Sequence, residues 1–367
     1  MRTLGIIGII FWMAVIAIVG TSPKLQRIEN VDGTQKRRYV VGFAIFAVLP
    51  IILWAGFRDG AGYVDTNAYI RMYKLVPDNI MQAGDFIANV DDKDPVFTVF
   101  LIIIKMIFGT SYRPFLLIMA IIEMGIVALF FRKYSSQFVL SLFFFVASAE
   151  YFSWIFNGMR QFLAVSILLV GFGLLLRKKY MHYIILVLIA STIHGTALIM
   201  LPILFIVQGK PWNKKTMITI LFAVMILFAT SRFTSLLDSL LQSTQYADAV
   251  SSWNDDGTNP IRVLFQMIPT ILAFIGRKQL QKEDDRTIAI CTNMSIISSM
   301  LWLVSMVTSG IYMGRLPIYA NMFNYILLPY ELDRFFAKES AKIAKIGMVI
   351  VYLSYYYYQF HFAWGTI

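Results

Sequence analysis

The sequence predicts an all-α protein that passes through a membrane many times. Of its 367 residues, 58% are hydrophobic and only 14% are charged, whereas about 25% of the residues of a soluble domain are charged. Apolar runs recur along the chain, and many approach the roughly 20 residues that a spanning helix requires. Short clusters of Lys and Arg separate these runs, as expected of cytoplasmic loops. We therefore expect a single integral membrane domain over residues 1–367.

Two sets of apolar segments make up this domain. The longer ones are 4–20, 40–57, 114–131, 160–176, 287–309, 312–330 and 346–363. The shorter or interrupted ones are 95–108, 137–156, 183–193, 195–208, 216–231 and 261–276. Together they predict about 11–13 membrane segments, some of them short, broken or re-entrant. Irregular backbone at membrane depth must be covered by protein or water, so these interruptions predict a polar cavity.

The distribution of charge predicts which loops face the cytoplasm. Basic clusters place 21–39, 177–179, 210–215, 277–282 and 334–345 inside. Segments 58–94 and 232–260 contain many Asp residues and few bases, so we expect them to be the outer loops.

The segment 95–108 needs a separate explanation. Arg132 and Lys133 mark an inside end, so an odd number of crossings must separate them from the outer loop 58–94. Two apolar segments lie between. We expect 95–108, about 21 Å long as a helix, to be re-entrant or interfacial, with Lys105 reaching a lipid headgroup.

Several functional classes are disfavoured by the sequence. The formal net charge is +11, but Lys and Arg are dispersed in short clusters and form no large basic surface with interleaved aromatic residues, so we expect no nucleic-acid partner. Cys291 is the only cysteine, which excludes an internal disulfide. No P-loop, dinucleotide-binding glycine motif, HExxH or CxxC is present. We expect neither a metal site nor a cofactor.

Arg160 is a polar residue where lipid disfavours one, and such residues are functional candidates. It lies between Asn157 and Gln161, at the outer start of the apolar segment that ends at Arg177. A guanidinium keeps its charge and can bind a phosphate through two parallel hydrogen bonds. The alternative is a long side chain that reaches the headgroups from an interface. The neighbouring amides favour a binding role.

His194 is the second candidate. It follows the inside cluster Lys178–Lys179 by a distance of about 24 Å in a helix, which places it near the same outer edge as Arg160. Gly195 and small hydroxylated residues surround it, as a helix break requires. The alternative is a structural histidine among apolar neighbours.

The outer segment after 40–57 contains a third group, Arg58, Asp59, Asp65 and Tyr69. These side chains could ring an opening with charges and hydrogen-bonding groups. The alternative is an ordinary polar loop held by an Arg–Asp pair.

Further polar residues lie at other segment ends. Arg315 with Tyr319 repeats the pattern of an outer arginine and an aromatic partner, at the outward end of 312–330. Glu150, about ten residues before Arg160, is a candidate to pair with an arginine or to relay a proton, and Glu123 is a second intramembrane carboxylate.

These candidates converge on the outer rim of a membrane cavity. Arginines there suit a pyrophosphate that links a polyprenol to a sugar, because they would bind it and stabilise the negative charge as it leaves. A neutral imidazole or a carboxylate would accept the proton of an attacking sugar hydroxyl.

The motifs resemble those of the EpsG family of bacterial exopolysaccharide polymerases, which are related in kind to Wzy-type O-antigen polymerases. The resemblance covers roughly residues 40 to 330. The motifs are Arg58 with Gly62-Tyr63-Val64-Asp65-Thr66 and Tyr69, then Asp94-Pro95-Val96-Phe97, Met159-Arg160-Gln161-Phe162-Leu163-Ala164, His194-Gly195-Thr196-Ala197-Leu198, and Arg315 with Tyr319.

The resemblance implies a GT-C-like membrane glycosyltransferase in the bacterial plasma (inner) membrane. Its donor and acceptor would be undecaprenyl-pyrophosphate-linked oligosaccharides, used without nucleotide sugar or metal, and a separate protein would set chain length. Arg160 and Arg315 would bind the pyrophosphate. His194 would act on the acceptor hydroxyl, with Asp65 as the rival base, and Arg58 and Asp65 would hold sugar or a neighbouring side chain.

Two other functions remain open. A flippase or transporter of lipid-linked oligosaccharides would also place arginines in a cavity, although such proteins usually have two similar halves and no internal duplication is visible here. A membrane acyltransferase would also use a histidine, but its catalytic residues would face the cytoplasm.

Overall fold

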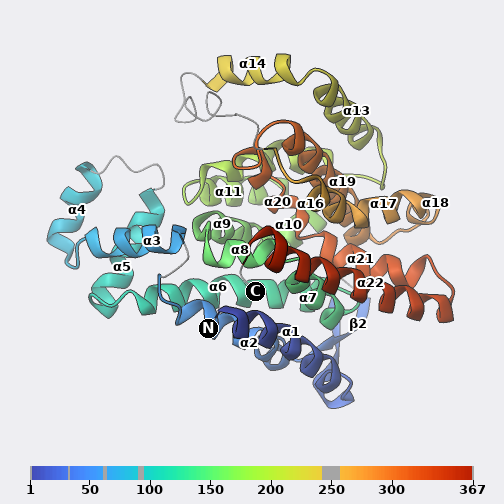
Figure 1. The fold of residues 1–367 in the computed structure, drawn as a ribbon, viewed down its shortest axis with the longest axis horizontal. Helices are drawn as coiled ribbons and strands as arrows, with labels where there is room; N and C mark the ends of the chain where they lie inside the picture. Colours follow the sequence, from blue (N-terminus) through green and yellow to red (C-terminus); the bar gives the residue numbers. More distant parts are fainter. Residues whose placement is uncertain (1, 32–33, 61–63, 90–94, 242–256, 366–367) are drawn as a thin grey trace. The chain divides into compact units, whose positions relative to one another are not determined.

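The computed structural model describes residues 2–31, 34–60, 64–89, 95–241 and 257–365 (Figure 1). These residues form two compact units, one of Met1–Leu198 with Ile346–Ile367 and one of Ile199–Lys345. Within the described ranges the chain is almost entirely helical, and its strands form one two-stranded sheet. The motif residues Gly62, Tyr63 and Asp94 and the acidic residues Asp248, Asp255 and Asp256 lie outside the described residues.

The first unit contains α1 (Arg2–Val19), η1 (Pro23–Leu25), β1 (Gln26–Val31), β2 (Thr34–Tyr39), α2 (Val41–Gly56), α3 (Val64–Leu75), α4 (Ile80–Asn89), α5 (Pro95–Phe108), α6 (Arg113–Tyr134), α7 (Phe138–Ala147), α8 (Glu150–Phe156), α9 (Met159–Val170), α10 (Phe172–Leu176), α11 (Tyr180–Ser191) and most of η2 (Gly195–Ile199). The second contains α12 (Met200–Ile206), α13 (Lys214–Phe228), α14 (Thr230–Leu241), α16 (Pro260–Gln266), α17 (Ile268–Ile275), α18 (Arg277–Leu280), α19 (Arg286–Val307), η3 (Met313–Arg315), α20 (Ile318–Asn321) and α21 (Asn324–Arg334). The helix α22 (Lys338–Tyr358) begins in the second unit and ends in the first, where the π-helical turn η4 (Gln359–Ala363) follows it.

An antiparallel pair, α2 and α6, forms the framework of the first unit (Figure 1). At one end, Arg38 Nε donates to the carbonyl of Lys133 at 3.1 Å, and Arg132 donates to the carbonyl of Tyr39. At the other end, Gly56 packs so closely on Leu117 that a Cβ would lie 2.9 Å from the Leu117 Cα atom. Glycine is therefore required at position 56.

The connection between α2 and α6 begins and ends on the same side of the membrane. This follows because the end of α2 and the start of α6 lie at the same end of the antiparallel pair. An even number of crossings must therefore occur between Phe57 and Tyr112. The helix α5 has the range expected for 95–108, and it packs on α3, α4 and α6.

The outer segment 58–94 was expected as a loop, but its described part folds into the helices α3 and α4. A shared hydrophobic core joins these helices to α5, α6 and α9, through buried side chains that include Tyr73, Ala83, Leu101, Phe115 and Met159.

Lys105 does not extend to a lipid headgroup, so that expectation is wrong. Its side chain is buried, and the ammonium donates to the carbonyls of Lys74 at 2.8 Å and Val76 at 2.6 Å. The last carbonyls of a helix have no partner within the helix, and Lys105 supplies one at the C-terminal end of α3.

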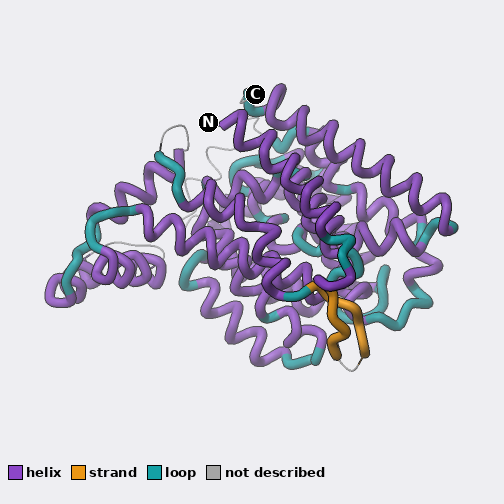
Figure 2. Tube along the Cα trace, turned by 90° about the horizontal axis from the view of Figure 1, so that it is seen from below, coloured by secondary structure: helices purple, strands orange, loops and turns teal. Residues whose placement is uncertain are grey.

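The predicted inside segment 21–39 contains the antiparallel hairpin of β1 and β2, coloured orange in Figure 2. Arg38 and Arg132 attach this hairpin to the end of α6, and Arg132 also forms an ion pair with Glu29. The two arginines of this connection lie at the end of the α2–α6 pair that the charge distribution places inside.

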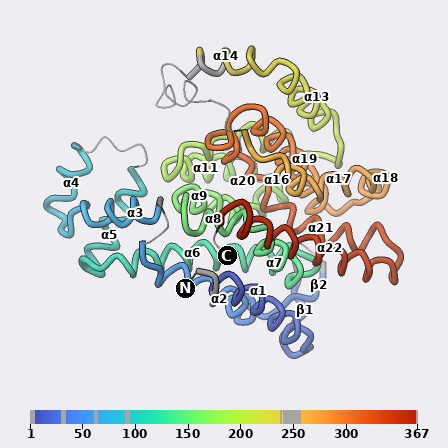
Figure 3. Tube along the Cα trace, in the orientation of Figure 1, coloured from blue at the N-terminus to red at the C-terminus, as the bar shows by residue number. Residues whose placement is uncertain are grey.

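The helices α9 and α11 lie side by side in the first unit (Figure 3). Gly171 separates α9 from α10, and at this position the side chains of Leu186 and Tyr183 occupy the space of a Cβ. The chain then turns at Arg177–Lys179 and returns along α11. Residues near the start of α9 and after the end of α11 therefore come to the same end.

The second unit is organised around α19, whose side chains are mostly buried. Small polar residues connect it to its neighbours. The Thr270 hydroxyl lies 2.6 Å from that of Ser299, and Ser298 donates to Asn321 at 3.1 Å. Helices that pack in a membrane often use such small polar side chains.

Two described helices, α6 and α19, are long and apolar enough to cross a membrane. Four spans result if each bent pair is counted as one: α7 with α8, bent by 72°, and α13 with the start of α14, bent by 102°. Shorter apolar helices, among them α2, α5, α9 and α11, correspond to other expected segments. The chain is a helical membrane protein with many short helices.

Candidate functional site

Gly158 begins the site, because it joins α8 to α9 in a left-handed conformation with φ of 56°. A Cβ here would overlap the ring of Trp154, so only glycine allows both the conformation and the close approach. The backbone N–H of Gly158 donates to Oδ2 of Asp65 at 3.2 Å. Asp65 thus connects the start of α3 to the start of α9.

Arg160 lies on the first turn of α9, above two aromatic rings. Its Cζ atom is 5.9 Å from the ring centroid of Tyr69 and 5.8 Å from that of Phe97. The backbone N–H and the guanidinium of Arg160 both donate to the Tyr69 hydroxyl. Tyr69 is 7% exposed, and burial raises its pKa although the charge of Arg160 opposes this. The hydroxyl therefore stays neutral at physiological pH.

His194 is joined to the same helix by a chain of hydrogen bonds. Nε2 of Gln161 donates to Oγ1 of Thr196 at 3.3 Å, and Oγ1 of Thr196 lies 2.8 Å from Nδ1 of His194. The histidine follows the end of α11, and Thr196 is in η2. Because α9 and α11 pack antiparallel, the start of α9 and the end of α11 lie at the same end of the pair. This brings Gln161 close to Thr196 and His194.

Arg58 faces the protein interior. It is 5% exposed and lies 5.2 Å from the ring centroid of Phe156. Its guanidinium donates to the Thr66 hydroxyl at 3.0 Å, to the carbonyl of Ala55 and to the sulfur of Met159. Arg58 thus holds neighbouring groups of α2, α3 and α9, whereas Asp59 beside it is exposed.

The remaining candidates lie on other helices. Glu150 begins α8, is buried, and accepts a hydrogen bond at 3.2 Å from the indole of Trp154. Glu123 is fully buried in α6. Arg315 is exposed on η3 and Tyr319 is buried on α20, both in the second unit. The structure brings Asp65, Tyr69, Arg160, Gln161 and His194 together through hydrogen bonds and ring contacts.

Among the described residues, no three His, Cys, Asp or Glu side chains are placed to hold a metal ion. The positive charge of the site comes from Arg160, and its titratable nitrogen from His194.

The model of the EpsG family matches residues 41–365 of the chain. The chain belongs to the EpsG family. The matched range includes all ten residues expected in the site, from Arg58 to Tyr319. Membership of the EpsG family supports a Wzy-like polysaccharide polymerase embedded in a membrane. No curated protein and no solved structure matches the chain.

In this EpsG-family protein, two residues that the sequence did not assign to the site complete it. Thr196 orients the imidazole, and its position two residues after His194 is a signal that could have identified it. Phe97 supplies the second ring below Arg160. It lies in an apolar helix, and its place in the motif Asp94-Pro95-Val96-Phe97 is the signal that could have identified it.

Proposed function

We propose that the protein joins undecaprenyl-pyrophosphate-linked oligosaccharide repeats into a polysaccharide on the outer face of the bacterial plasma membrane. The observation that supports this most is the connection of Arg160 and His194 through adjacent residues of α9. The chain from Gln161 to Thr196 to His194 fixes the imidazole relative to the guanidinium. The guanidinium can stabilise an anionic leaving group, and the imidazole can accept the proton of a hydroxyl.

Arg160 binds the pyrophosphate of the donor. Its neighbours Tyr69 and Phe97 exclude water from one side of the guanidinium, and electrostatic attraction is stronger where water is excluded. When the bond between the anomeric carbon and the pyrophosphate oxygen breaks, undecaprenyl pyrophosphate leaves with the electron pair. Arg160 stabilises the negative charge of this leaving group.

His194 accepts the proton of the acceptor hydroxyl. With its proton on Nδ1 donated to Oγ1 of Thr196, the imidazole carries its acceptor electron pair on Nε2. The acceptor oxygen attacks the anomeric carbon as its proton moves to Nε2. Asp65 is the rival base, but its Oδ2 accepts from the Gly158 backbone, which favours a positioning role for this carboxylate.

The other site residues support this arrangement. Gln161 holds Thr196, and Arg58 fixes the starts of α3 and α9. Asp59, which is exposed beside Arg58, and Glu150 remain proposals for substrate binding, as do Arg315 and Tyr319 in the second unit. A GT-C-like reaction of this kind uses the lipid pyrophosphate itself as the activated donor, and a separate regulator of chain length is the expected protein partner.

The experiment is a polymerisation assay in proteoliposomes. Lipid-pyrophosphate repeats are purified from producing cells that lack the polymerase, and the products are scored for a ladder of longer glycans and for released undecaprenyl pyrophosphate. We expect wild type to form both. Arg71→Ala is a matched control, because Arg71 is an exposed arginine of α3. Movement of lipid across the bilayer without a ladder would contradict the proposal and support a flippase.

A further inference from the structure

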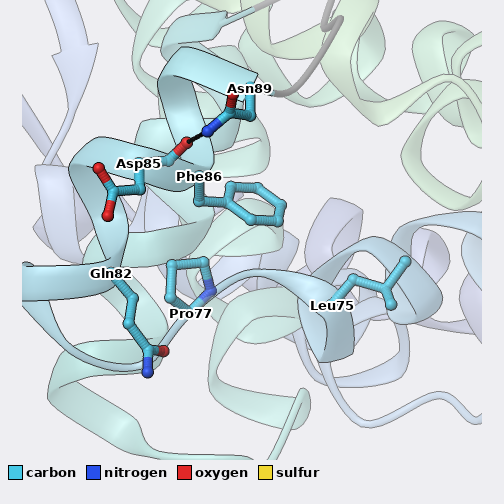
Figure 4. Close-up of a pocket in the computed structure, with 6 residues that line it drawn as sticks. All are labelled: Leu75, Pro77, Gln82, Asp85, Phe86 and Asn89. Carbon is cyan, nitrogen blue, oxygen red and sulfur yellow. Dashed lines mark hydrogen bonds between the residues drawn. The ribbon is translucent and has the colours of Figure 1, made fainter.

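A pocket of about 490 Å³ lies beside α4, in the part of the first unit expected on the outer side. It is lined by Leu75, Pro77, Gln82, Asp85, Phe86 and Asn89, which are drawn in Figure 4. Pockets of about 300–1,000 Å³ are typical of sites for small ligands. The volume is therefore sufficient for a short stretch of glycan.

The polar lining comes from one face of α4. Gln82, Asp85 and Asn89 follow each other at spacings of three and four residues, which places them on one side of a helix. Asn89 Nδ2 donates to the Asp85 carbonyl at 2.7 Å, which fixes the orientation of the Asn89 amide. The lining thus offers a carboxylate and two amides to a ligand that both donates and accepts hydrogen bonds.

Apolar groups complete the pocket. The ring of Phe86 lies between Asp85 and Gln82 on one side and Leu75 on the other, with Pro77 below it (Figure 4). An aromatic face beside hydrogen-bonding groups suits a sugar ring, which has apolar C–H faces and polar edges. Among the described residues that line the pocket, Asp85 is the only charged one. It favours a ligand rich in neutral hydroxyls over an anionic one.

The pocket is firmly connected to the candidate site. Tyr69 and Leu75 belong to the same helix, α3, and six residues of a helix span about 9 Å. Phe86 packs against the hydrophobic core that also contains Tyr69, Phe97 and Met159. A glycan bound at α4 would therefore lie a short distance from the groups around Arg160.

We propose that this pocket binds neutral sugars of the growing glycan, away from the reacting end. The inference rests on the proposed polymerase function and adds a second binding site to it. The pocket holds the longer of the two substrates, so its effect depends on glycan length. We expect a single repeat to make fewer contacts with α4 than a longer glycan does.

The test compares Asp85→Asn and Gln82→Ala with Asp78→Asn in proteoliposomes. Asp78 is an exposed aspartate just before α4, outside the pocket lining, so its change removes the same charge. The substrates are the lipid-linked single repeat and lipid-linked oligomers separated by length. We expect both pocket variants to raise the KM for oligomers about threefold to tenfold. The KM for the single repeat and the values of Asp78→Asn should match wild type.

A binding measurement separates this inference from the polymerase proposal. Oligosaccharide released from the same lipid is titrated into wild type and the variants by calorimetry. We expect Asp85→Asn to weaken binding and Asp78→Asn to leave it unchanged, whether or not the preparation polymerises. Equal binding by wild type and Asp85→Asn would overturn the inference. The absence of any binding of the oligosaccharide by wild type would overturn it as well.

Discussion

Oγ1 of Thr196 lies 2.8 Å from Nδ1 of His194, so the residue two positions after the histidine controls its ring. The same hydroxyl accepts a hydrogen bond from Gln161, next to Arg160. A hydrogen bond at one imidazole nitrogen sets the protonation of the other. In the proposed reaction, Nδ1–H donates to Thr196 and Nε2 is thereby the proton acceptor.

Replacing Thr196 by Val keeps the shape of the side chain and removes both hydrogen bonds. We expect kcat for polymerisation to fall about tenfold or more, with little change in KM, because the orientation of the base is lost. Thr196→Ser should restore most of the rate. The control is Thr192→Val, since Thr192 is exposed and its hydroxyl donates to the carbonyl of Ile189 in its own helix. Wild-type rates for Thr196→Val would contradict this role.

Arg160→Ala should lower the rate of chain lengthening by about 10²–10³, because one group that stabilises a developing charge contributes this much. Arg160→Lys keeps the charge but loses the planar pair of donors, so we expect partial activity. The assay is the initial rate of undecaprenyl pyrophosphate release. An equal loss in Arg71→Ala would mean that general surface charge, rather than this side chain, matters.

Tyr69→Phe tests the pKa of a buried hydroxyl. Burial raises the pKa of Tyr69 above its ordinary value of about 10. The neutral form is thus favoured in the folded state. This contribution to stability is complete below pH of about 10 and is lost as the pH rises through the folded pKa. We expect the thermal midpoint of wild type to fall more steeply above pH of about 10 than that of Tyr69→Phe. Parallel curves would exclude the effect.

Lys105→Met should reduce stability by about 1–2 kcal/mol, because the carbonyls of Lys74 and Val76 lose their donor. The measurement is chemical unfolding in detergent. Lys74→Met is the control, since Lys74 is exposed on α3. If Lys105→Met changed only the dependence of activity on lipid headgroups, the capping role would be wrong.

The predicted segments 40–57, 114–131 and 287–309 are helices with similar bounds, and α5 has the bounds predicted for 95–108. The segment 312–330 was expected as one long run, but it is divided among η3, α20 and α21. Continuous apolar runs leave little choice of structure in a membrane, because every backbone group must be paired internally. The polar helices α3 and α4 were missed. Their apolar residues are interrupted by polar and turn-forming ones, and the core formed with α5 and α6 stabilises them.

The residue types of the candidate site were also predictable, whereas their bonds were not. Gln161 and Thr196 are 35 positions apart, and their contact depends on the packing of α9 against α11. Arg58 is a second example. As a charged residue at a helix end it was expected at an outer opening, but in the folded chain it donates to Thr66 and Met159.

The most direct test of the central claim, that Arg160 and His194 act in one site, is a double-mutant cycle. Initial polymerisation rates are measured for Arg160→Ala, His194→Ala and the double variant, with unfolding curves to confirm that each is folded. Residues that act as a unit in one transition state have strongly non-additive effects. We predict that the double variant is no slower than the slower single variant, within about threefold. A loss equal to the product of the two single losses would contradict the account, as would wild-type rates for either single variant.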